Sequence, residues 1–186
     1  MITVVSGLPR SGTSLMMQIL EASGYEILTD GLRKADENNL NGYFEYEKVK
    51  SLGKDNSWMA GAEGKTVKII AQLLPYIPEG FEYRIFFMER NLDEIVSSQS
   101  RMLGRLNKKI SLVDNNMLKS VFEKQADAVI KQMAERTNAS LLRVSFNGLM
   151  NNNETEIEAL ERFSEGKISR GAVTRIINPD HYREKF

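Results

Sequence analysis

The amino-acid sequence predicts an α/β fold in which helices cover both faces of a mostly parallel sheet of 4 to 5 strands. Three observations support this prediction. The first 22 residues contain an apolar strand, a glycine-containing loop and a helix in direct succession. Further apolar runs follow, and helical patterns separate them. Such alternation is typical of βαβ units with right-handed crossovers, whose ligand sites lie at the carboxyl ends of the strands.

The strands are predicted from apolar runs. The first covers Ile2 to Ser6, which is rich in β-branched residues and ends at Gly7. Later runs predict strands at Thr66 to Ala71, Tyr83 to Met88 and Leu141 to Phe146. Tyr25 to Leu28 is a candidate for one more short strand.

The helices are predicted from apolar residues at helical spacing. The positions that define them are Leu15, Met16, Ile19 and Leu20; Ile95, Met102 and Leu106; Met117, Val121, Val129 and Met133; and Ile157, Leu160 and Phe163. The polar stretch from Gly31 to Gly42 has no such period and is interpreted as a loop. A loop of this length in a small domain usually binds something or covers a site.

Length and composition limit the class of protein. A chain of 186 residues, with 41% apolar and 27% charged residues, predicts one globular domain over residues 1–186. The 25 basic and 25 acidic residues give a net charge of +0, which argues against a general nucleic-acid or membrane-surface binder. Without cysteine and with His181 as the single histidine, the chain has no thiolate or His-rich metal site. It shows no basic N-terminal region and no apolar run near the ~20 residues of a membrane helix, so we expect a cytoplasmic protein.

The loop between the first strand and the first helix has the composition of a phosphate-binding loop. Residues 7–14 read Gly-Leu-Pro-Arg-Ser-Gly-Thr-Ser. Glycines let the backbone wrap an anion, and the N–H groups of the helix start point toward it. The spacing matches the nucleotide loop GxxxxGK[ST], except that Thr13 replaces the lysine and Arg10 carries the positive charge. We therefore expect a three-layer sandwich of the P-loop type, although a tight turn without a ligand is the alternative.

Residues 7–14 resemble the 5′-phosphosulfate loop of sulfotransferases, in which Lys or Arg precedes Ser-Gly-Thr. The donor of that family is 3′-phosphoadenosine 5′-phosphosulfate (PAPS), and an Arg after a later strand binds its 3′-phosphate together with a Ser eight positions on. Arg90 and Ser98 match this pair. Independently, Arg90 directly follows an apolar strand, and Ser98 shares the inward helix face of Ile95 and Met102. The candidate donor-binding residues are Gly7, Pro9, Arg10, Ser11, Gly12, Thr13, Ser14, Arg90 and Ser98.

The resemblance covers Met1 to about Arg105, and Asn38 to Glu45 is similar to a segment of bacterial sulfotransferase-like proteins. It implies transfer of a sulfuryl group to a hydroxyl or amine of a small-molecule, carbohydrate or peptide acceptor. The product would be 3′,5′-diphosphoadenosine, and no metal is required. Because the chain is short for this family, a homodimer is one way to complete an acceptor pocket.

Arg10 and two carboxylates are the candidate catalytic residues. Arg10 is suited to stabilise charge on the leaving phosphate, and a carboxylate would take the proton of the acceptor. Glu45 is the first choice, because its spacing to Val49 and Leu52 places it on the inward face of a helix predicted to begin at Gly42. A first-turn acid that complements the helix dipole is an equal alternative for Glu45. Asp30, at the end of the candidate strand Tyr25 to Leu28, is the second choice.

Two other functions stay open. A P-loop nucleotide kinase or NTPase would use the same loop, with Ile85 to Glu89 as the acidic strand that positions magnesium. Thr13 argues against it, because the missing lysine normally reaches the β and γ phosphates. A non-catalytic nucleotide-binding protein is the third interpretation.

Overall fold

Four parallel strands form the central sheet, in the spatial order β2-β1-β3-β4. The computed structural model describes residues 1–32, 42–105 and 115–177. The strands are β1 (Ile2–Gly7), β2 (Thr66–Lys68), β3 (Tyr83–Glu89) and β4 (Ala139–Ser145). With helices on both sides of this sheet, the predicted α/β class and the parallel strands are confirmed.

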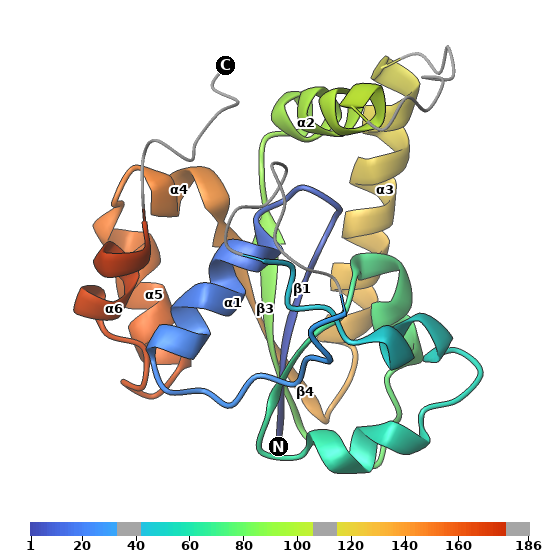
Figure 1. Ribbon diagram of the computed structural model, residues 1–186, viewed down its shortest axis with the longest axis vertical. Helices are drawn as coiled ribbons and strands as arrows, with labels where there is room; N and C mark the ends of the chain where they lie inside the picture. Colours follow the sequence, from blue (N-terminus) through green and yellow to red (C-terminus); the bar gives the residue numbers. More distant parts are fainter. Residues whose placement is uncertain (33–41, 106–114, 178–186) are drawn as a thin grey trace.

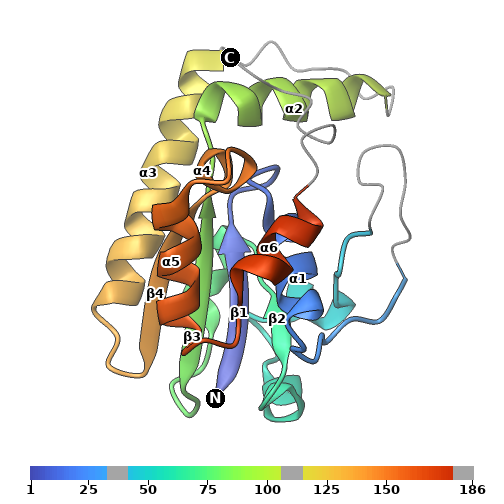
Figure 2. The same ribbon diagram turned by 90° about the vertical axis from the view of Figure 1, so that its left-hand side faces the viewer.

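Helices form the two outer layers (Figure 1). One face carries α1 (Thr13–Ala22), α4 (Phe146–Met150), α5 (Glu154–Phe163) and α6 (Arg170–Ile176). The other carries α3 (Asn115–Ala134) and three short 3-10 helices, η1 (Glu47–Ser51), η2 (Ser57–Ala62) and η3 (Ala71–Tyr76). The remaining helix, α2 (Leu92–Arg105), crosses above the carboxyl edge of the sheet in both views (Figure 2).

The alternation of side chains along each strand divides the core in two. Val4 of β1 and Phe87 of β3 pack with α3 and the 3-10 helices. Their neighbours Val5 and Phe86 pack with α1, α4, α5 and α6. Because both faces of the sheet are covered, the strands are apolar almost throughout, which made them recognisable in the sequence.

The sheet places the site region at one edge. β1 lies between β2 and β3, so the chain passes from one side of β1 to the other, and such a switch point is where open α/β sheets bind ligands. The strand register pairs Gly7 with Met88 and Glu89 with Ser145. The segments that follow β1, β3 and β4 therefore emerge side by side.

Four local predictions differ from the structure. Phe146, predicted as the last residue of a strand, begins α4, because β4 ends at Ser145. Tyr25 to Leu28 forms only an isolated parallel bridge, between Ile27 and Thr66. The strand predicted to Ala71 ends at Lys68. The helix predicted from Gly42 is wrong, because the chain there lacks helical structure up to Tyr46 and η1 begins at Glu47.

Residues 33–41 of the predicted loop, the helix position Leu106 and the single histidine, His181, lie outside the described residues. Within the described part of the chain, no helix combines the length and apolar character needed to cross a membrane.

Candidate functional site

The loop after β1 has a backbone that only glycine fits at two positions. Gly7 has φ 147°, and a Cβ there would lie 2.5 Å from the Oγ of Ser11 and 2.6 Å from the carbonyl oxygen of Met88. Gly12 has φ 99°, and its Cβ would lie 2.4 Å from the Cδ2 of Phe146. Both glycines of the predicted loop are therefore required by close packing as well as by backbone conformation.

The start of α1 is suited to an anion. Gly12 is the N-cap residue and offers no side chain to cap the helix, and the first turn contains no acidic residue. The first N–H groups of a helix have no intrahelical acceptors and carry the positive end of its dipole. Beside them the hydroxyl of Ser11 is fully buried and has no hydrogen-bond partner among the described residues. Because buried hydroxyls normally form a hydrogen bond, this one is suited to donate to an atom of a bound anion.

The structure brings the two halves of the predicted motif together. The Nε of Arg10 donates to the Oγ of Ser98 at 2.9 Å, and an Nη1 of Arg90 donates to the carbonyl oxygen of Arg10 at 3.2 Å. Arg10 itself has φ 70°, a left-handed conformation that is unusual for a residue with a side chain. Contacts from α2 and from the end of β3 thus hold the loop at its strained residue.

The other predicted donor-binding residues lie in the same loop. Pro9, Thr13 and Ser14 are half-buried, on either side of the buried Ser11. Ser98 is buried, with 6% of its surface exposed, as its place on the inward face of α2 predicted. Its bond to Arg10 supplies the partner that a buried hydroxyl needs.

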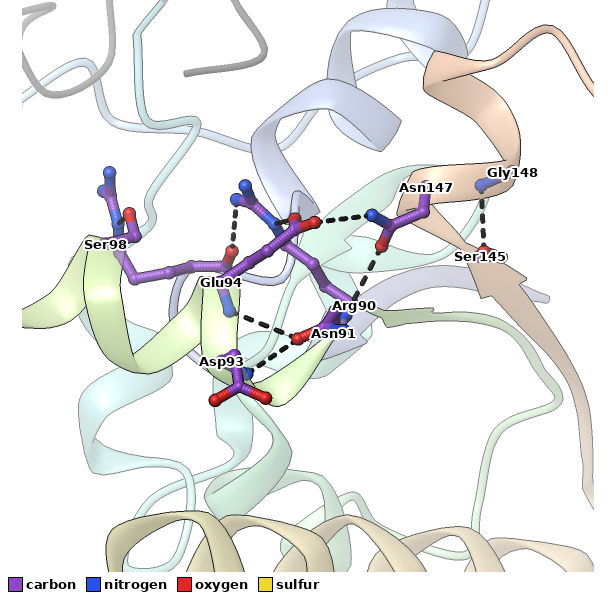
Figure 3. Close-up of polar contacts among 9 residues, drawn as sticks. Arg90, Asn91, Asp93, Glu94, Ser98, Ser145, Asn147 and Gly148 are labelled. Carbon is purple, nitrogen blue, oxygen red and sulfur yellow. Dashed lines mark hydrogen bonds and ion pairs between the residues drawn. The ribbon is translucent and has the colours of Figure 1, made fainter. Parts of the chain in front are cut away.

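A buried ion pair that the sequence did not indicate holds Arg90. Its Nε donates to the Oε2 of Glu94 at 2.7 Å, and only 9% and 2% of the two side chains are exposed. The Nδ2 of Asn147 donates to the other carboxylate oxygen, Oε1, at 2.9 Å, while its Oδ1 accepts the backbone N–H of Asn91 at 3.4 Å (Figure 3). Through Asn147, the junction between β4 and α4 joins the site.

Phe146, the first residue of α4, packs under the same group. The centre of the Arg90 guanidinium lies 4.3 Å from the centroid of the Phe146 ring, at cation–π distance. The same ring approaches Gly12, where an added Cβ would overlap it. One aromatic side chain therefore contacts both the phosphate loop and the arginine.

Local capping sets the direction of the chain after Arg90. The Oδ1 of Asn91 accepts the backbone N–H of Asp93 at 2.8 Å and that of Glu94 at 3.4 Å, so Asn91 caps the start of α2. Figure 3 shows this cap directly beside the ion pair. The cap fixes Arg90 and Glu94 on either side of the first helical turn.

Asp30 has a structural role. Its two carboxylate oxygens accept the backbone N–H groups of Leu32 at 3.0 Å and of Glu47 at 2.6 Å. These bonds, with the one from Glu47 as the larger cause, lower the pKa of Asp30 from its ordinary value. A carboxylate with both oxygens bonded and a lowered pKa is a weak proton acceptor.

Glu45 lies in the segment before η1 and not on a helix face, contrary to the prediction. Its Oε1 lies 3.9 Å from the Nζ of Lys68, which is 7% exposed. Lys68 also donates to the carbonyl oxygen of Tyr43. Between Tyr43 and Glu45, Phe44 has φ 51°, so the backbone turns sharply before Glu45. The Glu45 carboxylate therefore lies at ion-pair distance from a buried lysine at the end of β2, and its position does not follow helix periodicity.

A small hollow lies next to Arg90 on the α3 side of the sheet. It has a volume of about 190 Å³, and Leu8, Met88, Arg90 and Asp127 are among the residues that line it. Glu89 and Arg143 border it as an ion pair, in which the Nε of Arg143 lies 3.0 Å from each carboxylate oxygen. The acid at the end of β3 is thus bound to an arginine.

The sequence was compared with models of known protein families and with curated proteins, and neither comparison found a match.

Proposed function

We propose that this chain is a PAPS-dependent sulfotransferase. One observation supports the proposal most. Arg90 and Ser98 lie 80 and 88 positions after Arg10 in the sequence, and yet both form direct hydrogen bonds with it at an uncapped helix start. Two arginines at the carboxyl edge of a parallel sheet suit a ligand that carries phosphate groups at two points.

The residues present fit such a donor. Gly7 and Gly12 allow the loop its positive-φ backbone, and the buried Ser11 hydroxyl has no partner among the described residues. The loop from Gly7 to Ser14 would hold the 5′-phosphosulfate, and Arg90 with Ser98 would hold the 3′-phosphate. When bound, PAPS supplies an activated sulfuryl group on a 5′-phosphate that departs during the transfer.

The side chains of the chain supply charge and a proton acceptor. The guanidinium of Arg10, held by Ser98, stabilises negative charge on the departing 5′-phosphate. Of the two candidate bases, Glu45 is the better one, because both oxygens of Asp30 already accept backbone N–H groups. Glu45 takes the proton of the acceptor hydroxyl or amine, and the ammonium of Lys68 beside it orients the carboxylate.

The kinase or NTPase alternative receives less support. It requires a free acid at the end of β3, but the carboxylate of Glu89 bonds to Arg143 through both oxygens. It also requires a lysine where Thr13 stands.

Calorimetry with 3′,5′-diphosphoadenosine, in buffer with EDTA, tests the proposal. We expect binding without magnesium, a strong loss of affinity in Arg90→Ala, and weaker binding of ATP. Arg162→Ala is the control, since Arg162 is exposed on α5 and pairs only loosely with Glu158. Equal affinity for ATP and 3′,5′-diphosphoadenosine would contradict the proposal.

Turnover tests the assigned base. With radiolabelled PAPS and a broad acceptor panel, we expect transfer by the wild-type chain, a strong loss in Glu45→Gln and a smaller change in Asp30→Asn. Binding without transfer to any acceptor would favour a non-catalytic nucleotide-binding protein.

A further inference from the structure

We infer that Glu94 is a positioning residue for Arg90, and that with Asn147 it sets the preference of the site for a nucleotide carrying a 3′-phosphate. The inference rests on the proposed function, because it assigns a cause to the phosphate selectivity of that same site. Glu94 itself is 2% exposed and acts through the arginine.

The guanidinium of Arg90 is fixed on three sides. Its Nε donates to Glu94 (Figure 3). The Nη1 donates to the carbonyl oxygen of Arg10, and the face of the guanidinium packs on Phe146. A guanidinium is a planar fork, so its hold on a phosphate depends on the direction of that plane. Among these three contacts, the bond to Glu94 is the one that joins two opposite charges, and it therefore contributes most to the orientation.

Glu94 needs two acceptor oxygens to do this. One oxygen accepts from Arg90 and the other from the amide NH2 of Asn147. The amide of Asn147 cannot turn round freely, because its own oxygen accepts the backbone N–H of Asn91. Arg90 and Asn147 therefore both act as donors, and the carboxylate of Glu94 accepts from each of them.

This arrangement makes Glu94→Gln informative. Glutamine has the shape of glutamate but only one acceptor group, so one of its two contacts must place a donor against a donor. Adding Asn147→Asp supplies an acceptor on the other side. The carboxylate introduced at position 147 would accept from the glutamine NH2, and the glutamine oxygen would accept from Arg90. The double variant keeps the negative charge within the network and restores an acceptor for Arg90 and a donor–acceptor pair between residues 94 and 147.

Charge alone would act in the opposite direction. Removing the carboxylate beside Arg90 raises the local positive potential, and this favours an anionic ligand. A purely electrostatic role for Glu94 therefore predicts tighter nucleotide binding in Glu94→Gln, whereas a positioning role predicts weaker binding of the 3′-phosphate. The sign of the effect separates the two.

The experiment compares the affinities of 3′,5′-diphosphoadenosine and adenosine 5′-monophosphate, which lacks the 3′-phosphate. We expect Glu94→Gln to lower the preference for the diphosphate by about tenfold, the loss of one charge-assisted hydrogen bond, while affinity for the monophosphate stays unchanged. The double variant Glu94→Gln with Asn147→Asp should regain the preference. Glu158→Gln is the matched control, because it removes the carboxylate of an exposed pair with the same four-residue spacing.

A ligand-free readout covers the case in which the nucleotide proposal fails. In NMR spectra of arginine-labelled protein, the Nε–H of Arg90, identified by its loss in Arg90→Lys, should exchange slowly with water. It should become exposed in Glu94→Gln and protected again in the double variant. If the wild-type chain binds neither nucleotide, the proposed function fails, and this signal still decides whether Glu94 holds Arg90.

In the affinity comparison, three results would overturn the inference: an unchanged diphosphate preference in Glu94→Gln, an equal loss of affinity for both nucleotides, or no rescue by the double variant.

Discussion

Replacing Gly12 by alanine is expected to destabilise the chain more than replacing Gly24 by alanine. Both glycines have left-handed backbones, with φ 99° and φ 78°. They differ in space: a Cβ on Gly12 would lie 2.4 Å from Phe146, whereas a Cβ on Gly24 would meet nothing within 4 Å. Gly24→Ala thus measures the backbone cost alone, and Gly12→Ala adds the clash.

The two costs have known sizes. A left-handed conformation costs a residue with a side chain about 1–2 kcal/mol. Overpacking one carbon against a fixed ring costs about 1–3 kcal/mol. We therefore expect Gly24→Ala to lower the free energy of unfolding by about 1–2 kcal/mol and Gly12→Ala to lower it by about 2–5 kcal/mol.

Urea unfolding followed by circular dichroism measures both changes, and thermal melting should show about 2–4 °C per kcal/mol for a chain of this size. Because Phe146 also supports Arg90, nucleotide affinity should fall in Gly12→Ala and stay unchanged in Gly24→Ala. Equal destabilisation by the two substitutions would refute the close contact between Gly12 and Phe146.

Three further predictions concern stability. Asn153→Ala removes the side-chain cap of α5 and should cost about 1 kcal/mol in urea unfolding, with nucleotide affinity unchanged. The folded-state pKa of Asp30 is lowered, so its contribution to stability is present above the unfolded value of 3.8 and is lost as the pH falls through the lower folded value. The stability gap between wild type and Asp30→Asn should therefore be constant near neutral pH and narrow below pH 3.8; a gap independent of pH would contradict it. Burial raises the pKa of Tyr83 to about 12 from 10.0, so the unfolded chain ionises first and stability should fall between these pH values. Tyr83→Phe should show a shallower decline, since Tyr25 also has a raised pKa; a decline as steep as that of the wild type would contradict the contribution of Tyr83.

The sequence was most informative where the pattern is local. An apolar run, a glycine and a helical period lie within 22 consecutive residues, so the β1–loop–α1 unit could be predicted with its neighbours unknown. Arg90 and Ser98 were proposed from the family resemblance, and local pattern agreed with it, since one follows a strand and the other lies on an inward helix face. Because parallel strands end at the same edge of the sheet, the segment after β3 was expected to lie near the loop after β1, which contains Arg10.

Contacts across the fold could not be predicted. The bond between Asn147 and Glu94 spans 53 residues, and an acid in the first turn of a helix is by itself explained by the helix dipole. Phe146 appeared in the sequence as the last residue of a strand, although it begins α4. Nothing in the local sequence around these three residues indicates that they meet at Arg90.

The segment around Glu45 shows tertiary structure overriding local pattern. The spacing of Glu45, Val49 and Leu52 fits a helix, but the left-handed Phe44 turns the chain. Lys68, which lies on the separate strand β2, then fixes that turn through the carbonyl of Tyr43. The carboxylate proposed as the base is therefore held by a neighbouring strand, which the spacing could not reveal.

The most direct test of the account is to locate the nucleotide on the protein. In NMR titration of the labelled chain with 3′,5′-diphosphoadenosine, we expect saturable shifts of the backbone amides from Gly7 to Ser14, Pro9 excepted, and of the Arg90 Nε–H, with the amides of α5 unchanged. Shifts confined to other parts of the chain, or no saturable shift in the loop, would contradict a donor site at the carboxyl ends of β1 and β3.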